Sequence, residues 1–180
     1  TPSRRFEFYS QRLAAYAARN RERVRAAGLD PDDDRFCLPH QPDLLAPPLE
    51  FPLLLIPVEV LPFAGSEGAH LPYLQQIAGQ HVFQHWKSWL EMNPATAAEL
   101  GLSDLDTVWV ESLRARVQVQ LRVYKGVRPG VVHLPLGYGR QQGSPWGRRG
   151  VNPLHLIETK REPLTGLPQV TETLVRVYRA

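Results

Sequence analysis

The chain has 180 residues, of which 43% are hydrophobic and 22% are charged, and its formal net charge is +3. This length and composition predict one ordinary domain with a core of its own. No apolar run approaches the ~20 residues needed to cross a bilayer, so we expect no direct membrane insertion. The one cysteine, Cys37, excludes an internal disulfide, an all-cysteine zinc site and an iron–sulfur cluster held by this chain alone.

Residues 10–27 place alanines and larger apolar side chains at roughly helical spacing, with arginines in between. This pattern predicts a peripheral helix that ends at Gly28. Clustered arginines can bind phosphate backbones, so nucleic-acid binding is one interpretation. Acidic residues lie close by in the sequence, however, and the arginines are not interleaved with a series of aromatic residues that could stack bases. A helix that faces solvent or another subunit is therefore favoured, and we expect no nucleic-acid partner.

Residues 29–52 are rich in proline and aspartate, a composition that predicts a long connector rather than a helix or a central strand. The aspartates that begin at Asp30 suggest calcium. An EF-hand loop, however, needs glycine at its sixth position and glutamate at its twelfth, and these positions hold Arg35 and Gln41. A solvated acidic turn is the favoured interpretation.

The clearest local pattern begins at Asn93, which can cap a helix whose first residue is Pro94 and which Gly101 ends. Residues 108–111 alternate valines with Trp109 and Glu111, which predicts a strand.

Residues 115–123 alternate apolar side chains with arginine and glutamine, which predicts a second strand with one buried face. Pro129 and Gly130 predict a turn into a further strand, followed by a loop over 135–139. Residues 173–178 again alternate and predict the final strand.

His81 and His85 would share one face of a helix, and Trp86, Trp89 and Leu90 would form an apolar stripe along it. A zinc-protease motif needs a glutamate between the histidines and a third ligand, and neither is present. Packing or surface histidines are therefore favoured over a metal site.

A stand-alone hydrolase is a further hypothesis. Ser66 and Ser144 lie in glycine-containing loops, but neither has the setting of a nucleophile elbow, and the sequence singles out no serine, histidine and aspartate in a triad.

Two glycine-rich loops follow predicted strands, at residues 136–139 and 147–154. They offer exposed backbone N–H groups and two arginines, Arg148 and Arg149, which suit phosphates and fused heterocycles. On these residues alone, glycines that only permit tight turns are the favoured interpretation.

The order and spacing of these motifs, together with TPSRRFEFYS, FPLLLIPVEV, GRRGVNPLHL, PLTGLP and VRVYRA, resemble the C-terminal dinucleotide-binding domain of molybdopterin oxidoreductases of the dimethyl sulfoxide reductase type. The likeness is greatest to the large subunits of polysulfide reductase and of quinol-oxidising complexes. It implies a mainly β fold with flanking helices (α+β), in which residues 53–180 form a double-psi β-barrel whose first strand is 53–60. Residues 1–52 would supply an N-terminal helix and a proline-rich connector.

The resemblance also implies a function. With it, ligand binding by the two glycine-rich loops is favoured over glycines that only permit tight turns. The domain would help to bind a bis-molybdopterin guanine dinucleotide, while the preceding domains of the same large subunit hold molybdenum and carry out the redox chemistry and electron transfer. An iron–sulfur subunit and a membrane anchor would be the further partners. The parent would be exported and membrane-associated or, alternatively, cytoplasmic.

No residue of this chain is expected to be catalytic or to ligate a metal. The alternative is a cofactor-free structural domain of a respiratory oxidoreductase complex. The residues that the resemblance implies for cofactor binding are Leu61, His70, His133, Gly137, Tyr138, Gly139, Arg148, Gly150, Asn152 and Thr171.

Overall fold

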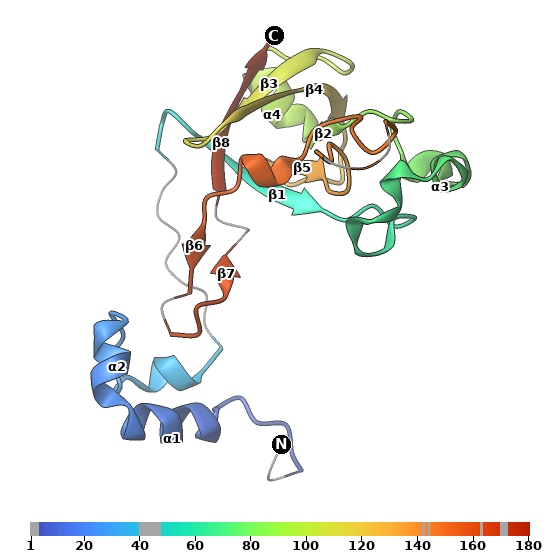
Figure 1. Ribbon diagram of the computed structural model, residues 1–180. Helices are drawn as coiled ribbons and strands as arrows, with labels where there is room; N and C mark the ends of the chain where they lie inside the picture. Colours follow the sequence, from blue (N-terminus) through green and yellow to red (C-terminus); the bar gives the residue numbers. More distant parts are fainter. Residues whose placement is uncertain (1–3, 40–47, 142, 144, 163, 170–172) are drawn as a thin grey trace. The chain divides into compact units, whose positions relative to one another are not determined.

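A computed structural model describes residues 4–39, 48–141, 143, 145–162, 164–169 and 173–180 (Figure 1). The chain divides into two compact units. The smaller unit comprises residues 1–46 and 161–168, and the larger comprises residues 47–160 and 169–180. No helix in the described part of the chain is both long and apolar enough to span a membrane.

The smaller unit begins with two short helices, α1 (Gln11–Arg19) and α2 (Arg21–Ala26). The expectation of one continuous helix was wrong, because Asn20 leaves the helical region, with φ −125° and ψ 39°. Gly28 ends the second helix in a left-handed conformation, with φ 77°, as the sequence predicted.

The connector contains one turn of 3-10 helix, η1 (Asp34–Cys37), although its composition predicted no helix. The Asp33 side chain begins this turn by accepting a hydrogen bond from the Arg35 backbone N–H over 2.9 Å. A single turn needs only such a local cap, which a proline-rich segment can still provide.

The larger unit contains a closed barrel of six strands in the order β1-β5-β2-β4-β3-β8. Two neighbouring pairs, β1 with β5 and β2 with β4, are parallel, and the other pairs are antiparallel. This closed, mixed sheet confirms the predicted double-psi β-barrel. The strands are β1 (Leu53–Val58), β2 (Trp89–Met92), β3 (Thr107–Glu111), β4 (Arg116–Val123), β5 (Val131–Pro135) and β8 (Thr173–Arg179).

Short elements fill the connections between the barrel strands. In Figure 1, α3 lies on the long excursion between β1 and β2. The short elements are η2 (Ala64–Ser66), η3 (Gly68–His70), α3 (Pro72–Ile77), η4 (Gly79–His81), α4 (Pro94–Glu99), η5 (Pro153–His155), and β6 (Lys160–Arg161) paired with β7 (Pro168–Gln169).

The barrel core is made by the inward-facing residues of the strands. Leu55, Leu90, Val108, Leu121 and Val175 each have 0% of their surface exposed. In β3 the alternation is as predicted, with the valines buried and the residues between them partly exposed. Burial of this apolar face stabilises the barrel.

β2 was not predicted, because its residues were interpreted as part of a helical stripe. No α-helix covers residues 82–88, and Leu90 and Trp89 lie on opposite faces of β2, in two different apolar clusters. A strand that is buried on both faces carries consecutive apolar residues, which is a pattern that a short helix also shows. His81 and His85 are exposed, and no group of three metal-ligating side chains occurs among the described residues.

β1 ends two residues before the predicted end of the first strand. Val60 accepts a turn hydrogen bond from the Phe63 backbone N–H over 2.8 Å, so the chain leaves the sheet after Val58. The excursion that follows begins one of the loops at the candidate site.

The capped helix was predicted correctly. The Asn93 side chain accepts from the Ala95 N–H over 2.9 Å, Pro94 is the first residue of α4, and Gly101 follows with φ 65°. The Asn93 amide also donates to the Val127 carbonyl over 2.6 Å, which ties the helix start to the turn before β5.

We therefore expect Asn93→Ala to lower the free energy of unfolding by about 2–3 kcal/mol, because it removes both the cap and the bond to Val127. Asn93→Ser keeps an acceptor that can cap the helix and loses the amide donor to Val127, so its cost should be about 1 kcal/mol. Urea unfolding of the two variants checks this. Equal losses would show that the cap contributes nothing.

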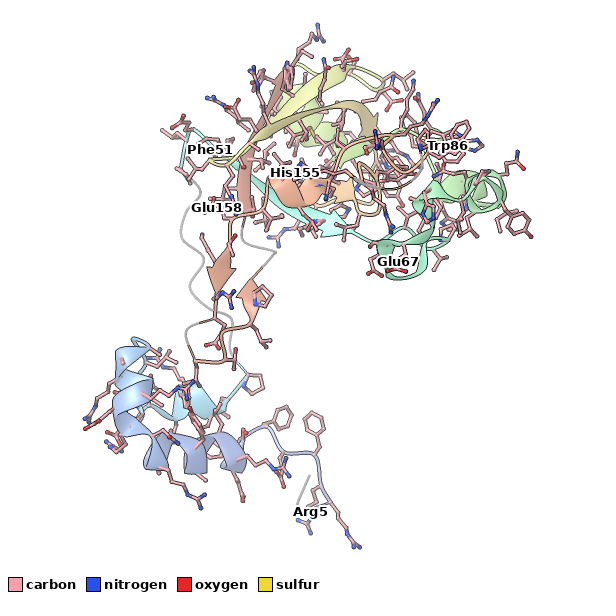
Figure 2. All side chains as sticks on the ribbon, in the orientation of Figure 1. Arg5, Phe51, Glu67, Trp86, His155 and Glu158 are labelled. Atoms are coloured by element: carbon pink, nitrogen blue, oxygen red, sulfur yellow. The ribbon has the colours of Figure 1, made fainter. Side chains whose placement is uncertain are left out.

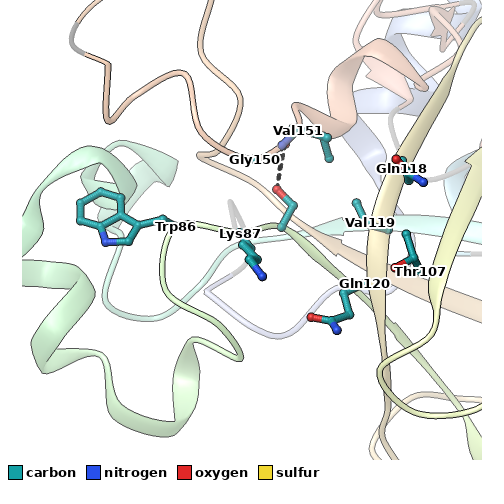
Figure 3. Close-up of a pocket in the computed structure, with 9 residues that line it drawn as sticks. Trp86, Lys87, Thr107, Gln118, Val119, Gln120, Gly150 and Val151 are labelled. Atoms are coloured by element: carbon teal, nitrogen blue, oxygen red, sulfur yellow. Dashed lines mark hydrogen bonds between the residues drawn. The ribbon is translucent and has the colours of Figure 1, made fainter.

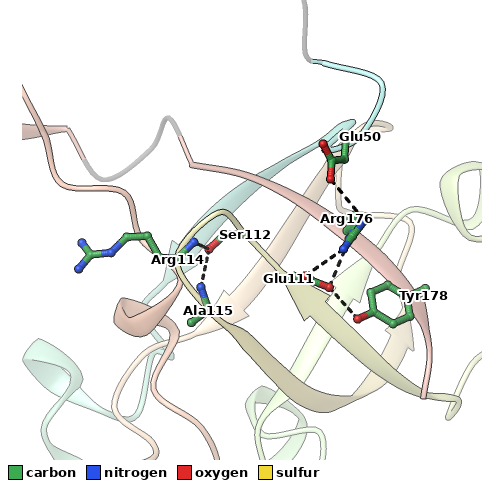
Figure 4. Close-up of polar contacts among 7 residues, drawn as sticks. All are labelled: Glu50, Glu111, Ser112, Arg114, Ala115, Arg176 and Tyr178. Carbon is green, nitrogen blue, oxygen red and sulfur yellow. Dashed lines mark hydrogen bonds and ion pairs between the residues drawn. The ribbon is translucent and has the colours of Figure 1, made fainter.

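A polar network joins β3 and β8 on the outside of the barrel (Figure 4). The Glu111 carboxylate accepts from Arg176 Nη2 over 2.9 Å and from the Tyr178 hydroxyl over 2.7 Å. Arg176 also lies 3.6 Å from the Glu50 carboxylate. The hydrogen bonds from Arg176 and Tyr178 hold the pKa of Glu111 below its ordinary value.

A lowered pKa in the folded state means that this network stabilises the protein above the unfolded pKa of glutamate, about 4.3, and that the stabilisation is lost as the pH falls further. We expect the melting temperature of the wild type to fall more steeply than that of Glu111→Gln between neutral pH and pH ~3. Glu99→Gln, at an exposed position of α4, is the matched control and should keep the wild-type pH dependence. Parallel curves for the wild type and Glu111→Gln would contradict the prediction.

Candidate functional site

Three loops meet where the parallel strands β1 and β5 end. They comprise residues 61–70 after β1, residues 136–141 after β5, and residues 147–155; Glu67 and His155 mark the first and third loops in Figure 2. The Gly139 N–H donates to the Arg149 carbonyl over 2.9 Å, and the Arg140 N–H donates to the Gly147 carbonyl over 2.9 Å. The Arg140 side chain donates to the Glu67 carbonyl over 3.1 Å. Backbone hydrogen bonds therefore join the second and third loops, and the Arg140 side chain joins the first loop to the second.

A cleft of 430 Å³ lies at the second and third loops. Its lining includes two arginines and, among the described residues that form it, no carboxylate. The lining residues are Val117, Gly139, Arg140, Gln141, Arg148, Gly150, Val151, Asn152 and His155. Four residues that the resemblance implied for cofactor binding are thus brought together here, and a cleft of this charge suits an anionic ligand.

The glycines of these loops are packed tightly by the protein itself. A Cβ atom at Gly139 would overlap backbone atoms of Val151 and Asn152. A Cβ at Gly150 would lie 2.6 Å from the Ser88 hydroxyl oxygen, and one at Gly137 would lie 2.7 Å from the Ser66 carbonyl oxygen. The small residues therefore permit contact between the loops, whether or not a ligand is also present.

Asn152 has a local role in the structure. Its side-chain oxygen accepts from the Leu154 N–H over 3.0 Å and begins η5. The amide nitrogen makes no hydrogen bond to the described residues, and Asn152 lines the cleft. One half of the side chain thus caps a turn, while the other half can donate to a ligand.

Tyr138 lies between Gly137 and Gly139, but its side chain is only 3% exposed. The ring packs edge-on against Phe63 and Trp89, with centroids 5.9 and 6.0 Å away. Burial raises the pKa of the phenol, which accepts a hydrogen bond from Gln75 over 3.3 Å. Any contact of Tyr138 with a ligand in the cleft therefore comes from its backbone.

Five of the expected residues that the structure describes do not line the cleft; besides Gly137 and Tyr138 they are Leu61, His133 and His70. Leu61 is 79% exposed and borders a separate pocket of 210 Å³ together with Glu91. His133 lies on β5, with its Nδ1 atom 3.7 Å from the Glu91 carboxylate. His70 Nδ1 lies 2.9 Å from the Glu67 carbonyl oxygen, the group that Arg140 also contacts.

Thr171, the last expected residue, lies outside the residues that the structure describes.

A second pocket, of 310 Å³, shares Gly150 and Val151 with the cleft (Figure 3). Ser88 reaches the Val151 backbone at this point, where its hydroxyl accepts from the N–H over 2.9 Å and donates to the carbonyl over 3.2 Å. The residues lining this pocket are Trp86, Lys87, Ser88, Thr107, Gln118, Val119, Gln120, Gly150 and Val151.

The sequence analysis missed Arg140, Ser88 and Gln75. Arg140 directly follows the Gly137 to Gly139 loop, and this position was the available signal. Ser88 and Gln75 are buried polar residues, and nothing in their sequence neighbourhood distinguishes them from surface residues.

Residues 76–174 match the family model described as the Molydopterin dinucleotide binding domain. The menaquinone reductase molybdopterin-binding-like subunit of Nitratidesulfovibrio vulgaris is 30% identical over 149 residues, which cover 79% of this chain and 22% of that subunit. The molybdopterin-containing subunit ArrA of the arsenate respiratory reductase of Chrysiogenes arsenatis is 27% identical over 191 residues, covering 92% of this chain and 22% of the subunit. The chain thus spans about a fifth of the length of both relatives.

Among solved structures, acetylene hydratase from Pelobacter acetylenicus is similar, with a TM-score of 0.59 and 23% identity. The match covers 87% of this chain and 22% of the hydratase chain. This likeness supports the fold.

The contact between the loops predicts a large cost for Gly139→Ala. Its Cβ would overlap the backbone of Val151 and Asn152, in addition to the strain of φ 66°, so we expect a loss of roughly 2–5 kcal/mol in urea unfolding. Gly101→Ala is the matched control, because Gly101 has φ 65° and no heavy atom within 4 Å of its added Cβ. It should cost only the strain, about 1–2 kcal/mol. Equal costs would show that the loops separate freely.

Proposed function

Because the chain belongs to the molybdopterin dinucleotide-binding domain family, we propose that it binds part of a bis-molybdopterin guanine dinucleotide in the cleft at residues 136–141 and 147–155. The observation that carries the proposal is the meeting of Arg140, Arg148 and Asn152 beside two glycines in one cleft. This arrangement combines positive charge, a free amide donor and backbone that a ligand can approach.

The cleft residues fit the chemistry of such a cofactor. A dinucleotide carries a pyrophosphate, and guanidinium groups bind phosphate oxygens with two parallel hydrogen bonds. Arg148 is exposed at the cleft, and the described residues that line the cleft include no carboxylate that would repel an anion. The Asn152 amide nitrogen can donate to a ring carbonyl or a phosphate oxygen and so fix the orientation of the ligand.

The contribution of this chain is to bind and orient the cofactor. When bound, the cofactor supplies redox chemistry at its molybdenum atom, and the ligands of that metal belong to other domains. Arg140 and Arg148 would neutralise the phosphates, while the packed glycine loops give the binding surface a fixed shape.

We propose further that the chain is the C-terminal domain of a larger oxidoreductase subunit. The two relatives described above, both named as reductase subunits, are each more than four times as long as the matched segment. The preceding domains of the same subunit would complete the cofactor site. An iron–sulfur subunit and a membrane anchor remain the proposed further partners.

A second candidate function is a structural domain that has the same barrel without the cofactor. The packing of Gly137, Gly139 and Gly150 by protein atoms is compatible with it, because these glycines have a role without any ligand. One relative is named a molybdopterin-binding-like subunit, which suits the same interpretation. Measuring pterin and molybdenum in the purified complete subunit separates the two functions.

Asn152→Asp separates cofactor binding from turn formation. The aspartate keeps the oxygen that caps η5, but it loses the amide donor and adds a negative charge beside the phosphates. We expect unchanged stability and a pterin content per folded subunit that is lower by about tenfold, which corresponds to about 1.4 kcal/mol. Arg148→Gln should act in the same direction.

Arg128→Gln, at an exposed arginine that does not line the cleft, is the matched control and should leave the pterin content unchanged. Full pterin content in both Asn152→Asp and Arg148→Gln would contradict the assignment of the cleft. A wild-type subunit without pterin would favour the structural alternative.

A further inference from the structure

We propose that Gln75 is a positioning residue that fixes the loops of the cofactor cleft relative to one another, an inference that rests on the proposed function. Gln75 lies on α3 and has 0% of its surface exposed. Its amide nitrogen donates to the Ala69 carbonyl over 2.7 Å and to the Tyr138 hydroxyl over 3.3 Å. Its amide oxygen accepts from the Trp86 N–H over 3.1 Å. Three separate segments thus depend on one buried side chain.

The bond to Ala69 fixes the first loop of the cleft. Ser66 and Glu67, in the same loop, present their carbonyl groups to Gly137 and Arg140. A Cβ at Gly137 would also lie only 3.3 Å from the Ala69 Cβ, so this part of the first loop is in close contact with the loop after β5. Displacing Ala69 therefore displaces the support of Gly137 and Arg140.

The bond to Tyr138 fixes the second loop. The tyrosine hydroxyl is held in an apolar cluster with Phe63 and Trp89, where an unpaired polar group would be costly. The Tyr138 Cβ lies 2.9 Å from the place that a Cβ at Gly150 would occupy. The position of the Tyr138 side chain therefore affects how closely the loop after β5 approaches the loop that contains Gly150.

The hydrogen bond from the Trp86 N–H links Gln75 to the third loop through the contacts of the Trp86 ring. Trp86 has φ 66°, a left-handed conformation that is unfavourable for a residue with a Cβ. The Trp86 ring packs against Trp146, with 4.9 Å between centroids, and the Arg149 guanidinium lies 4.9 Å from the Trp146 ring. Trp146 and Arg149 flank Arg148, the exposed arginine of the cleft.

These contacts give the amide of Gln75 a role that an apolar side chain of the same size cannot fill. Without it, the Ala69 carbonyl and the Tyr138 hydroxyl would each lose a buried hydrogen bond, and the Trp86 N–H would lose a partly buried one. The barrel core is built from other residues, so the loss should appear in the loops before it appears in the strands.

The test compares Gln75→Met with Gln76→Met, its exposed neighbour on the same helix, in the complete subunit. Hydrogen–deuterium exchange is measured together with the pterin content per folded molecule. For Gln75→Met we expect at least tenfold faster exchange at residues 66–70, 86–88 and 136–141, unchanged exchange in the barrel strands, and a lower pterin content. Gln76→Met should match the wild type in both measurements.

Wild-type exchange in the three segments of folded Gln75→Met, with full pterin content, would overturn the proposal. If Gln75→Met does not fold, Tyr138→Phe keeps the ring and removes one of the three bonds. It should speed exchange at 136–141, and wild-type exchange there would again overturn the proposal. A wild-type subunit without pterin would end the proposed function, and the exchange pattern alone would then decide whether Gln75 holds the loops.

Discussion

The close approach of the loop after β5 to the backbone of Val151 is the contact on which the candidate site depends. Gly139 and Gly150 allow this approach because neither carries a Cβ, and Ser88 fixes Val151 from the other direction through both its N–H and its carbonyl group. The floor of the cleft is therefore main chain, and its chemical character comes from the side chains around it. Because packed backbones leave no room to adjust, a substitution at these glycines changes the shape of the cleft, whereas one at its rim changes mainly its charge.

The elements that the sequence predicted well are those with local signals. The start of α4 needs only Asn93 and Pro94, and the faces of β3, β4 and β8 follow from alternation within each strand. The elements that it missed depend on the rest of the fold. β2 is buried on both faces because the segment around Phe83 and Tyr138 covers its outer side, and a strand of four residues is too short for alternation to reveal this. The break at Asn20 likewise divides a continuous apolar pattern at a single residue.

The site was predictable in part for the same reason. Gly139, Arg148, Gly150 and Asn152 belong to two loops that hydrogen-bond to each other, so a prediction that named both loops necessarily named neighbours in space. His133 does not line the cleft because it lies within β5, where its side chain faces Glu91. The cleft is formed by loops that follow the strands. Gln75 was beyond prediction, because polar residues are mostly exposed and only the packed loops show that this one is enclosed.

The presence of the glycine loops does not by itself distinguish a cofactor-binding barrel from a structural one, because the fold needs these glycines in either case. The distinction rests on groups to which the structure gives no other role. Arg140 is engaged by the Glu67 carbonyl, Arg149 lies over Trp146, and the oxygen of Asn152 caps a turn. The Arg148 guanidinium and the Asn152 amide nitrogen make no hydrogen bond to the described residues, yet both residues line the cleft. Both groups are therefore available for hydrogen bonds to an anionic ligand, which is what the proposed function requires of them.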